Sequence, residues 1–182
     1  MKRLLSIALF FFVAGCSSVK DIASLSPNSN VNIIPLKANK IIVETNQDAT
    51  VNFNFCMKSL LNDGYEITTK DRETGYILAE KKGQYDTYIK LNIMLDAETI
   101  KIIPMWKPGT SSMFMASAMS GIGGVNAGWE PALWMNNATK LSVAFIEADK
   151  VAHLFNGKIT YQTPEKTPLE KAFDSVNDPI YK

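Results

Sequence analysis

Thiol and imidazole groups are the side chains best suited to covalent or metal chemistry, and this chain has only Cys16, Cys56 and His153. Thiol catalysis needs a cysteine activated by a neighbouring base such as histidine. Cys56 falls on the apolar stripe of an expected helix, which predicts a buried core thiol, the alternative being a reactive or intermolecular one. His153 falls late in another expected helix, where a cation favours the C-terminal dipole. One histidine allows no histidine-pair metal site, so we expect no catalytic residues, no metal and no cofactor.

Cys16 ends a leader with the features of a secretion signal. Lys2 and Arg3 are followed by an apolar run from residue 4 to 13 that only Ser6 interrupts. About ten apolar residues suit the hydrophobic part of a signal peptide, which spans roughly 7–15 residues. A membrane-spanning helix needs about 20. Residues 1–15 are therefore expected to be a signal peptide.

Val13, Ala14, Gly15 and Cys16 resemble the lipobox of bacterial lipoproteins, in which an aliphatic and two small residues precede a cysteine. The resemblance implies lipidation of the Cys16 thiol, cleavage before it and acylation of the new amine. Two or more acyl chains hold a protein stably on a membrane. Because Ser17 is not Asp, the enterobacterial sorting rule implies the outer membrane, facing the periplasm, or the outer face of the plasma membrane in a single-membrane organism.

The charge balance gives no electrostatic footprint for nucleic acid. Without residues 1–15, which include Lys2 and Arg3, 17 basic side chains face 18 acidic ones, a net charge of about −1. Nucleic-acid binders show clustered positive charge. After Cys16 only Cys56 remains, which excludes an intramolecular disulfide between unmodified thiols. The expected partners are the membrane, through the lipid anchor, and an envelope protein.

Residues 16–39 are rich in Ser and Asn and predict a flexible tether. Residues 40–182 are long enough for one domain with a hydrophobic core. Within them, the four-three-four spacing of Ala49, Phe53, Cys56 and Leu60 predicts a helix over 48–62, with Gly64 past its end. Pro104 and Pro108 are expected to stop a strand at 99–105 and to place it at an edge. Period-two and turn signals predict the other early strands at 40–44, 65–69, 76–80 and 85–95.

Alternating four- and three-residue spacing from Trp134 to Phe155 predicts a long second helix, with Pro131 in its first turn and Gly157 past its end. A strand at 158–162 and a short helix at 167–176 complete the chain. Helices with one apolar stripe must cover one face of a sheet. The expected fold is α+β, with two layers and a mostly antiparallel sheet covered on one face by two main helices. In element order it resembles the helix-on-sheet modules of envelope lipoproteins such as the C component of the outer-membrane β-barrel assembly machinery.

The segment 108–129 has no charged residue and is rich in Gly, Ser, Ala and Met. Three interpretations are open. The segment is a long connection folded onto the sheet, or a partner-docking loop that uses adaptable methionines. The third is direct membrane contact, which the nearby Trp106, Trp129 and Trp134 favour. Long loops in compact domains are often functional. The candidate residues for partner or membrane contact are Met113, Phe114, Met115, Met119, Ile122 and Trp129.

The leading hypothesis is therefore a non-catalytic, lipid-anchored envelope protein, a partner-binding or assembly module that uses its sheet edge and the uncharged segment. One alternative is an apolar-ligand or lipid carrier with a cavity between the long helix and the sheet. A third class, an enzyme acting on cell-wall polymer, lacks a convincing pair of acids.

The lipid anchor gives a direct prediction. Cys16→Ala removes the thiol that lipidation requires, so the precursor should stay uncleaved and unlabelled when cells are fed radioactive palmitate. A variant that still matures and takes up label would show that the leader is not a lipoprotein signal.

Overall fold

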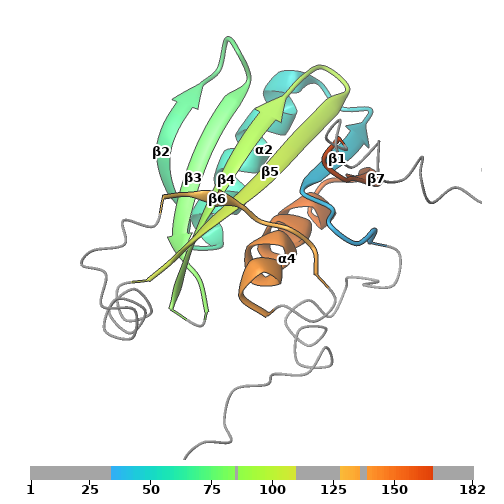
Figure 1. The fold of residues 1–182 in the computed structure, drawn as a ribbon. Coiled ribbons are helices and arrows are strands. Elements are labelled where there is room, and N and C mark those ends of the chain that lie inside the picture. The colour runs from blue at the N-terminus through green and yellow to red at the C-terminus, as the bar shows by residue number, and fades with distance from the viewer. Residues whose placement is uncertain (1–33, 85, 110–127, 136–138, 166–182) are drawn as a thin grey trace, which may run out of the picture.

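A computed structural model describes residues 34–84, 86–109, 128–135 and 139–165. Its seven strands form one sheet in the order β2-β3-β4-β5-β1-β7, with β6 paired to β5 and all pairs antiparallel (Figure 1). The predicted α+β class and mostly antiparallel sheet are confirmed. The elements are β1 (Lys40–Thr45), α2 (Ala49–Asn62), β2 (Glu66–Asp71), β3 (Tyr76–Lys82), β4 (Thr87–Leu95), β5 (Thr99–Pro108), β6 (Glu130–Pro131), α4 (Thr139–His153) and β7 (Gly157–Gln162).

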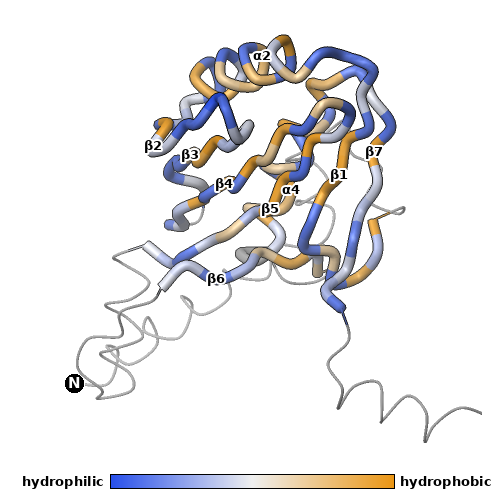
Figure 2. Tube along the Cα trace, turned by 90° about the horizontal axis from the view of Figure 1, so that it is seen from above, coloured by the Kyte–Doolittle hydropathy of each residue, from blue (hydrophilic) through white to orange (hydrophobic). Residues whose placement is uncertain are grey.

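The core lies on one face of this sheet because side chains alternate between faces along each strand. In β4, Ile89, Leu91 and Ile93 are buried while the residues between them are partly exposed. The hydrophobic positions along β1, β4 and β5 appear orange in Figure 2. Both helices cover this face: the buried side of α2 includes Phe53 and Leu60, and α4 buries Phe145.

Helix α2 agrees with its prediction at both ends. The Asp48 carboxylate accepts a hydrogen bond from the Thr50 backbone N–H at 2.7 Å, which caps the first turn. Gly64 follows the last turn with φ +79°, the left-handed conformation that favours glycine. Cys56 is buried on the sheet-facing side, as its place on the apolar stripe predicted.

The long second helix is shorter than its apolar spacing predicted. Helix α4 spans Thr139–His153, whereas Pro131 belongs to β6 and Trp134 lies between the two elements. Trp134 is buried without being part of a helix: its backbone N–H donates to Ala38 O at 2.8 Å, and its ring packs on Phe145. Gly157 opens β7 instead of capping the helix. Core contacts from an irregular segment can mimic helical spacing, which is why the prediction was wrong.

The expectation that Pro104 and Pro108 end an edge strand was also wrong. Strand β5 runs to Pro108 and lies between β4 and β1. The Pro104 carbonyl accepts from Ala132 N at 3.0 Å, on the side away from β4. The N–H and C=O of one residue point to the same side of an antiparallel strand. The missing N–H of Pro104 therefore removes no hydrogen bond to β4. Pro108 lies four residues further along β5, so its ring nitrogen also faces away from β4.

The folded domain begins before residue 40. Ile34 and Ala38 are buried in the core. Lys37 N donates to Trp134 O at 2.8 Å, and Asn39 N donates to Gln162 O at 2.9 Å. The last six residues of the predicted tether are thus part of the domain. Neither described helix is long and apolar enough to span a bilayer.

Two glycines with positive φ provide a matched stability test. Gly75 (φ +67°) closes the β2–β3 turn, and a Cβ there would overlap the Leu95 carbonyl oxygen. Gly64 has the same handedness but open space around it. We expect Gly64→Ala to cost about 1 kcal/mol for the left-handed backbone alone, and Gly75→Ala at least about 3 kcal/mol. Urea denaturation measures both, and equal losses would contradict the steric role of Gly75.

Candidate functional site

The residues predicted to contact a partner or the membrane fall largely outside the described residues. This holds for Val13, Ala14, Gly15 and Cys16, and for the candidate contacts Met113, Phe114, Met115, Met119 and Ile122. Trp129 is described and is partly exposed. Of the three tryptophans near the uncharged segment, Trp134 is buried and Trp106 packs against the core. Of the three, Trp129 is the partly exposed ring that lies outside the core cluster.

The residues that flank the stretch 110–127, Gly109 and Gly128, lie at one end of the sheet. On one side, Gly109 N donates to Asp86 O at 2.6 Å, next to the start of β4. On the other side, β6 pairs with β5 with Met105 opposite Pro131 and Trp106 opposite Glu130. Continuing this register places Gly128 near Pro108. Both ends of the uncharged stretch are therefore held at the same rim of the sheet.

An aromatic and cationic cluster surrounds this rim. The Trp129 ring has the Lys90 ammonium 4.2 Å and the Lys107 ammonium 4.6 Å from its centroid. Lys107 also lies 5.2 Å from the centroid of Tyr88. Cation–π contacts of this kind contribute about 0.5–1 kcal/mol each at exposed sites. We call Tyr88, Lys90, Lys107 and Trp129 the aromatic–lysine rim. Lys90 lies off the apolar face of β4 because it alternates with buried Ile89 and Leu91, and its contact with Trp129 depends on the β5–β6 pairing.

Cys56 and His153 have the structural surroundings that their sequence positions predicted. Burial raises the pKa of the Cys56 thiol to about 12, so the nucleophilic thiolate is scarce at neutral pH. His153 is the last residue of α4, and its Nδ1 lies 2.9 Å from the Asp149 carbonyl oxygen and 3.4 Å from Asp149 Oδ1. Among the described residues, no group of three or more His, Cys, Asp or Glu side chains could hold a metal ion.

Asp149 connects α4 to the sheet. It is fully buried, and the Tyr161 hydroxyl of β7 donates to its Oδ1 at 2.8 Å. Burial of the phenol, followed by this hydrogen bond to a carboxylate, raises the pKa of Tyr161 well above its usual value. Tyr161 is therefore a neutral donor at any physiological pH, and the contact holds β7 against the end of α4.

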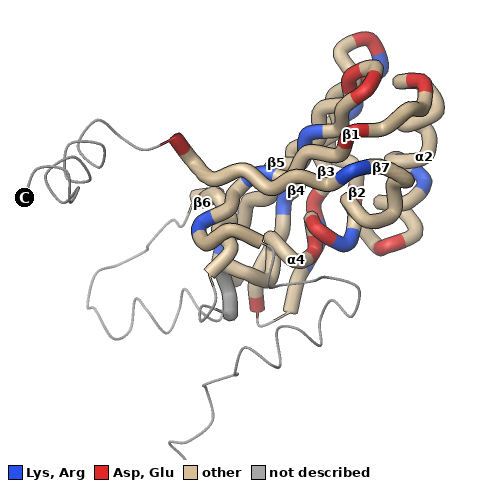
Figure 3. The backbone as a smooth tube through the Cα atoms, turned by 90° about the vertical axis from the view of Figure 1, so that its right-hand side faces the viewer, with Lys and Arg blue, Asp and Glu red and all other residues tan. Residues whose placement is uncertain are grey.

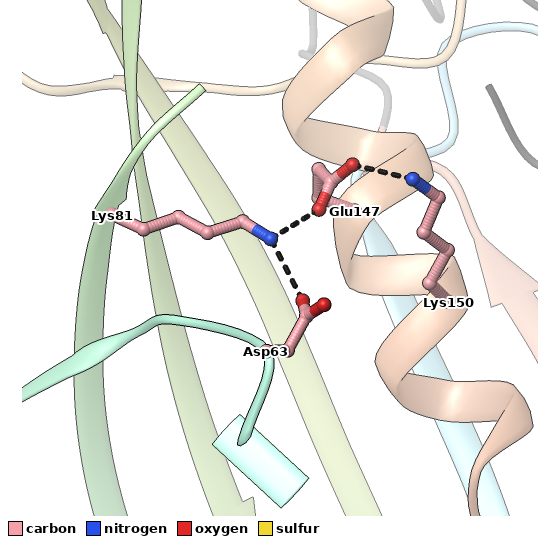
Figure 4. Close-up of polar contacts among 4 residues, drawn as sticks. All are labelled: Asp63, Lys81, Glu147 and Lys150. Atoms are coloured by element: carbon pink, nitrogen blue, oxygen red, sulfur yellow. Dashed lines mark hydrogen bonds and ion pairs between the residues drawn. The ribbon is translucent and has the colours of Figure 1, made fainter. Parts of the chain in front are cut away.

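A second charged cluster lies between the two helices (Figure 4). Lys81 extends from β3 on the helix-covered face, and its ammonium lies 2.7 Å from Asp63 Oδ2, just past α2, and 2.5 Å from Glu147 Oε2 on α4. Lys150 approaches the other oxygen of Glu147 at 2.7 Å. Lys81 and Glu147 are 14% and 13% exposed, so their charges are largely removed from water. One ammonium thus links both helices to the sheet.

The environment of this cluster changes the ionisation of its neighbours. Burial disfavours the charged form of Glu147, but the hydrogen bonds and charges of Lys150 and Lys81 outweigh it and lower the Glu147 pKa below its usual 4.5. The Tyr65 ring lies 4.3 Å from the Lys81 ammonium. Its hydroxyl is buried without a hydrogen-bond partner among the described residues. Burial, with the charges of Glu147 and Asp63, raises the Tyr65 pKa. The neutral Tyr65 phenol and the paired ions around Lys81 are the features of a structural link between the sheet and the helices.

Two cavities in the described part of the chain lie beside the helices. One of about 450 Å³ lies between the first turn of α2 and two hairpin turns, and is lined by both charged and apolar groups such as Arg72, Asp96 and Phe53. The other, about 290 Å³, lies between α2 and α4 beside Asp63 and Lys150. Neither of these two cavities lies between α4 and the sheet, where Phe145 and Ile102 belong to the packed core.

The backbone of β7 forms one edge of the sheet. Thr45 N donates to Glu98 O at 2.8 Å, so the main chain of Thr45 points toward β5. Because main-chain groups alternate in direction along a strand, the N–H and C=O groups of Glu44 and of its cross-strand partner Lys158 point toward each other. It follows that the N–H and C=O groups of Ile159 and Tyr161 point outward, where no described strand pairs with them. The sequence predicted the strand but not which of its residues would be available.

Comparison with protein-family models, with curated proteins and with solved structures finds no match to this chain.

The ion cluster gives a stability prediction. Lys81→Met leaves Glu147 and Tyr65 without the bridging charge and should cost about 3 kcal/mol, since breaking a buried pair strands its partner. The matched control is Lys150→Met, whose more exposed ammonium should contribute about 1 kcal/mol or less to stability.

The same cluster predicts a pH dependence. Because the pKa of Glu147 is lowered in the folded protein, the contribution of Glu147 to stability is present above pH 4.5 and is lost as the pH falls below that value. Chemical denaturation from pH 3 to 7 should show that the free energy of unfolding falls less with acid in Lys81→Met than in the wild type. Equal falls in the two proteins would contradict this prediction.

Proposed function

We propose that this chain is a non-catalytic, lipid-anchored protein of the cell envelope, a partner-binding or assembly module at the outer membrane. Cys16 in its lipobox would provide the anchor, and the β7 edge would provide the docking strand. The observation that carries the binding role is the outward-facing main chain of Ile159 and Tyr161. An extended partner segment can add to such an edge through backbone hydrogen bonds, a common mode of peptide recognition.

The two edges of the sheet differ in a way that favours β7. Strand β2 carries Glu66, Lys70 and Asp71, and its pairing with β3 shifts between Ile67 and Thr69. Charges and bulges of this kind protect an edge from pairing with other chains. Strand β7 has one charged residue, Lys158, and its pairing with β1 keeps one register over six residues. A partner strand would therefore meet fewer obstacles at β7.

The uncharged stretch 110–127 is the second part of this proposal. Met113, Phe114, Met115, Met119 and Ile122 offer apolar side chains without charge, and its ends are held at the aromatic–lysine rim. Methionine-rich surfaces adapt to varied apolar partners. We propose that this stretch contacts a partner or the membrane next to Trp129.

The edge is testable with a backbone substitution. Ile159→Pro removes an N–H that points away from β1, so the β1–β7 hydrogen bonds stay intact while a docking partner loses a donor. The matched control, Ile159→Ala, loses similar apolar packing but keeps the N–H. In whole cells, the protein is crosslinked and then purified. Wild type and Ile159→Ala should recover a partner, and Ile159→Pro should recover at least about tenfold less of it.

A second variant tests the uncharged stretch separately. Since the β5–β6 register brings Pro108 near Gly128, replacing residues 110–127 with Gly-Asn-Gly should close a short hairpin and preserve the sheet. Loss of the crosslinked partner in this variant, with unchanged circular dichroism, would support a role for the stretch in docking. An unchanged set of partners in both variants would refute the binding proposal.

A further inference from the structure

The face of the sheet opposite the helices carries a row of cationic and aromatic side chains. Lys82, Tyr88 and Lys107 stand opposite one another across β3, β4 and β5. They point away from the core because Thr87 and Ile89, which flank Tyr88, are buried on the helix-covered face. Figure 3 shows the lysine positions of β4 and β5 next to β6.

Charge pairing leaves part of this row uncompensated. Lys90 has a carboxylate partner, Glu80, at 2.9 Å. Lys82 and Lys107 form no ion pair within the described ranges. Glu130 does not neutralise them, because it stands opposite Trp106 on the helix-covered side. Other carboxylates near this face are Asp86, in the turn before β4, and Glu66, which stands opposite Glu80 on β2. Two ammonium groups are therefore available to an external anion beside the rings of Tyr88 and Trp129.

The combination of groups indicates the chemistry of that anion. Tryptophan and tyrosine are enriched at the headgroup level of membranes, and lysine stems can lie along apolar surface while the ammonium reaches the headgroups. We propose that Lys82, Lys107, Tyr88 and Trp129 form a membrane-contact surface that binds the phosphate headgroups of anionic phospholipids. This surface is separate from the β7 edge and does not require lipidation of Cys16.

An acidic protein surface is the competing ligand, and the geometry favours lipid. Tight protein interfaces centre on side chains that fill desolvated pockets. Neither cavity described above is lined by Lys82, Tyr88, Lys107 or Trp129. A row of cations and flat rings that lies outside both of these cavities suits a layer of mobile headgroups better than one fixed side chain.

The test uses residues 16–182 with Cys16→Ser, which retains every described helix and strand while removing the apolar leader. Flotation with phosphatidylcholine vesicles is compared with flotation on an equimolar mixture of phosphatidylcholine and phosphatidylglycerol. We expect binding to the anionic vesicles alone, and weaker binding as salt screens the charges. Each lysine near an anionic surface contributes about fivefold in partitioning, so the double variant Lys82→Gln, Lys107→Gln should bind roughly 25-fold less tightly.

Two controls separate charge at this surface from charge in general. Lys58→Gln with Lys70→Gln removes the same charge from the helix-covered side and should leave binding unchanged; Lys70 stands opposite buried Ile77. Lys82→Arg with Lys107→Arg should restore wild-type binding, which also guards against a folding defect. Equal binding to both vesicles, equal loss in both glutamine pairs, or no flotation of wild type would overturn the proposal. A wild type that ignores vesicles but crosslinks to an acidic envelope protein through this face would assign the surface to a protein instead.

Discussion

The apolar face shared by β1, β3, β4 and β5 is the constraint on which the rest of the structure depends. Its isoleucines and leucines are fully buried, including Ile41, Ile77, Leu91 and Ile102. Each such side chain contributes about 1.5–3 kcal/mol when it leaves water. A sheet with one apolar face needs a covering layer, and α2 and α4 both lie there. The opposite face carries the alternate residues, among them Lys90 and Lys107, which meet Trp129.

Lys81 shows how this constraint accommodates a charge. By alternation it belongs to the apolar face, in line with Ile77 and Ala79, yet it lies where the two helices leave room between them. An isolated ammonium there would be costly. Asp63 and Glu147 compensate it from opposite sides, and Lys150 balances Glu147 in turn. A buried network of this kind contributes little net stability but penalises any arrangement that separates its members. It fixes the position of α4 relative to α2.

Sequence patterns predicted what depends on local periodicity. The class of the fold, helix α2 with Gly64 past its end, and the burial of Cys56 all follow from neighbours within a few residues. The errors arose where distant segments decide. Pro104 is tolerated inside the sheet because its ring nitrogen faces β6, and Trp134 is buried by hydrogen bonds to residues near Ala38. The aromatic–lysine rim was missed for the same reason: no spacing in the sequence places Trp129 over Lys90 and Lys107.

The two proposed surfaces follow from one feature of the topology. Because β1 is the first described strand yet lies between β5 and β7, the last described strand forms an edge of the sheet, and no described strand pairs with its outer backbone. The early strands β3, β4 and β5 form a consecutive meander whose uncovered face ends at the β5–β6 pairing. The docking that we propose through backbone groups thus uses β7, and the side-chain recognition that we propose uses the meander face. In the function that we propose, the domain engages headgroups through one surface and keeps the other free for an extended partner, because the β7 edge and the rim residues belong to different strands.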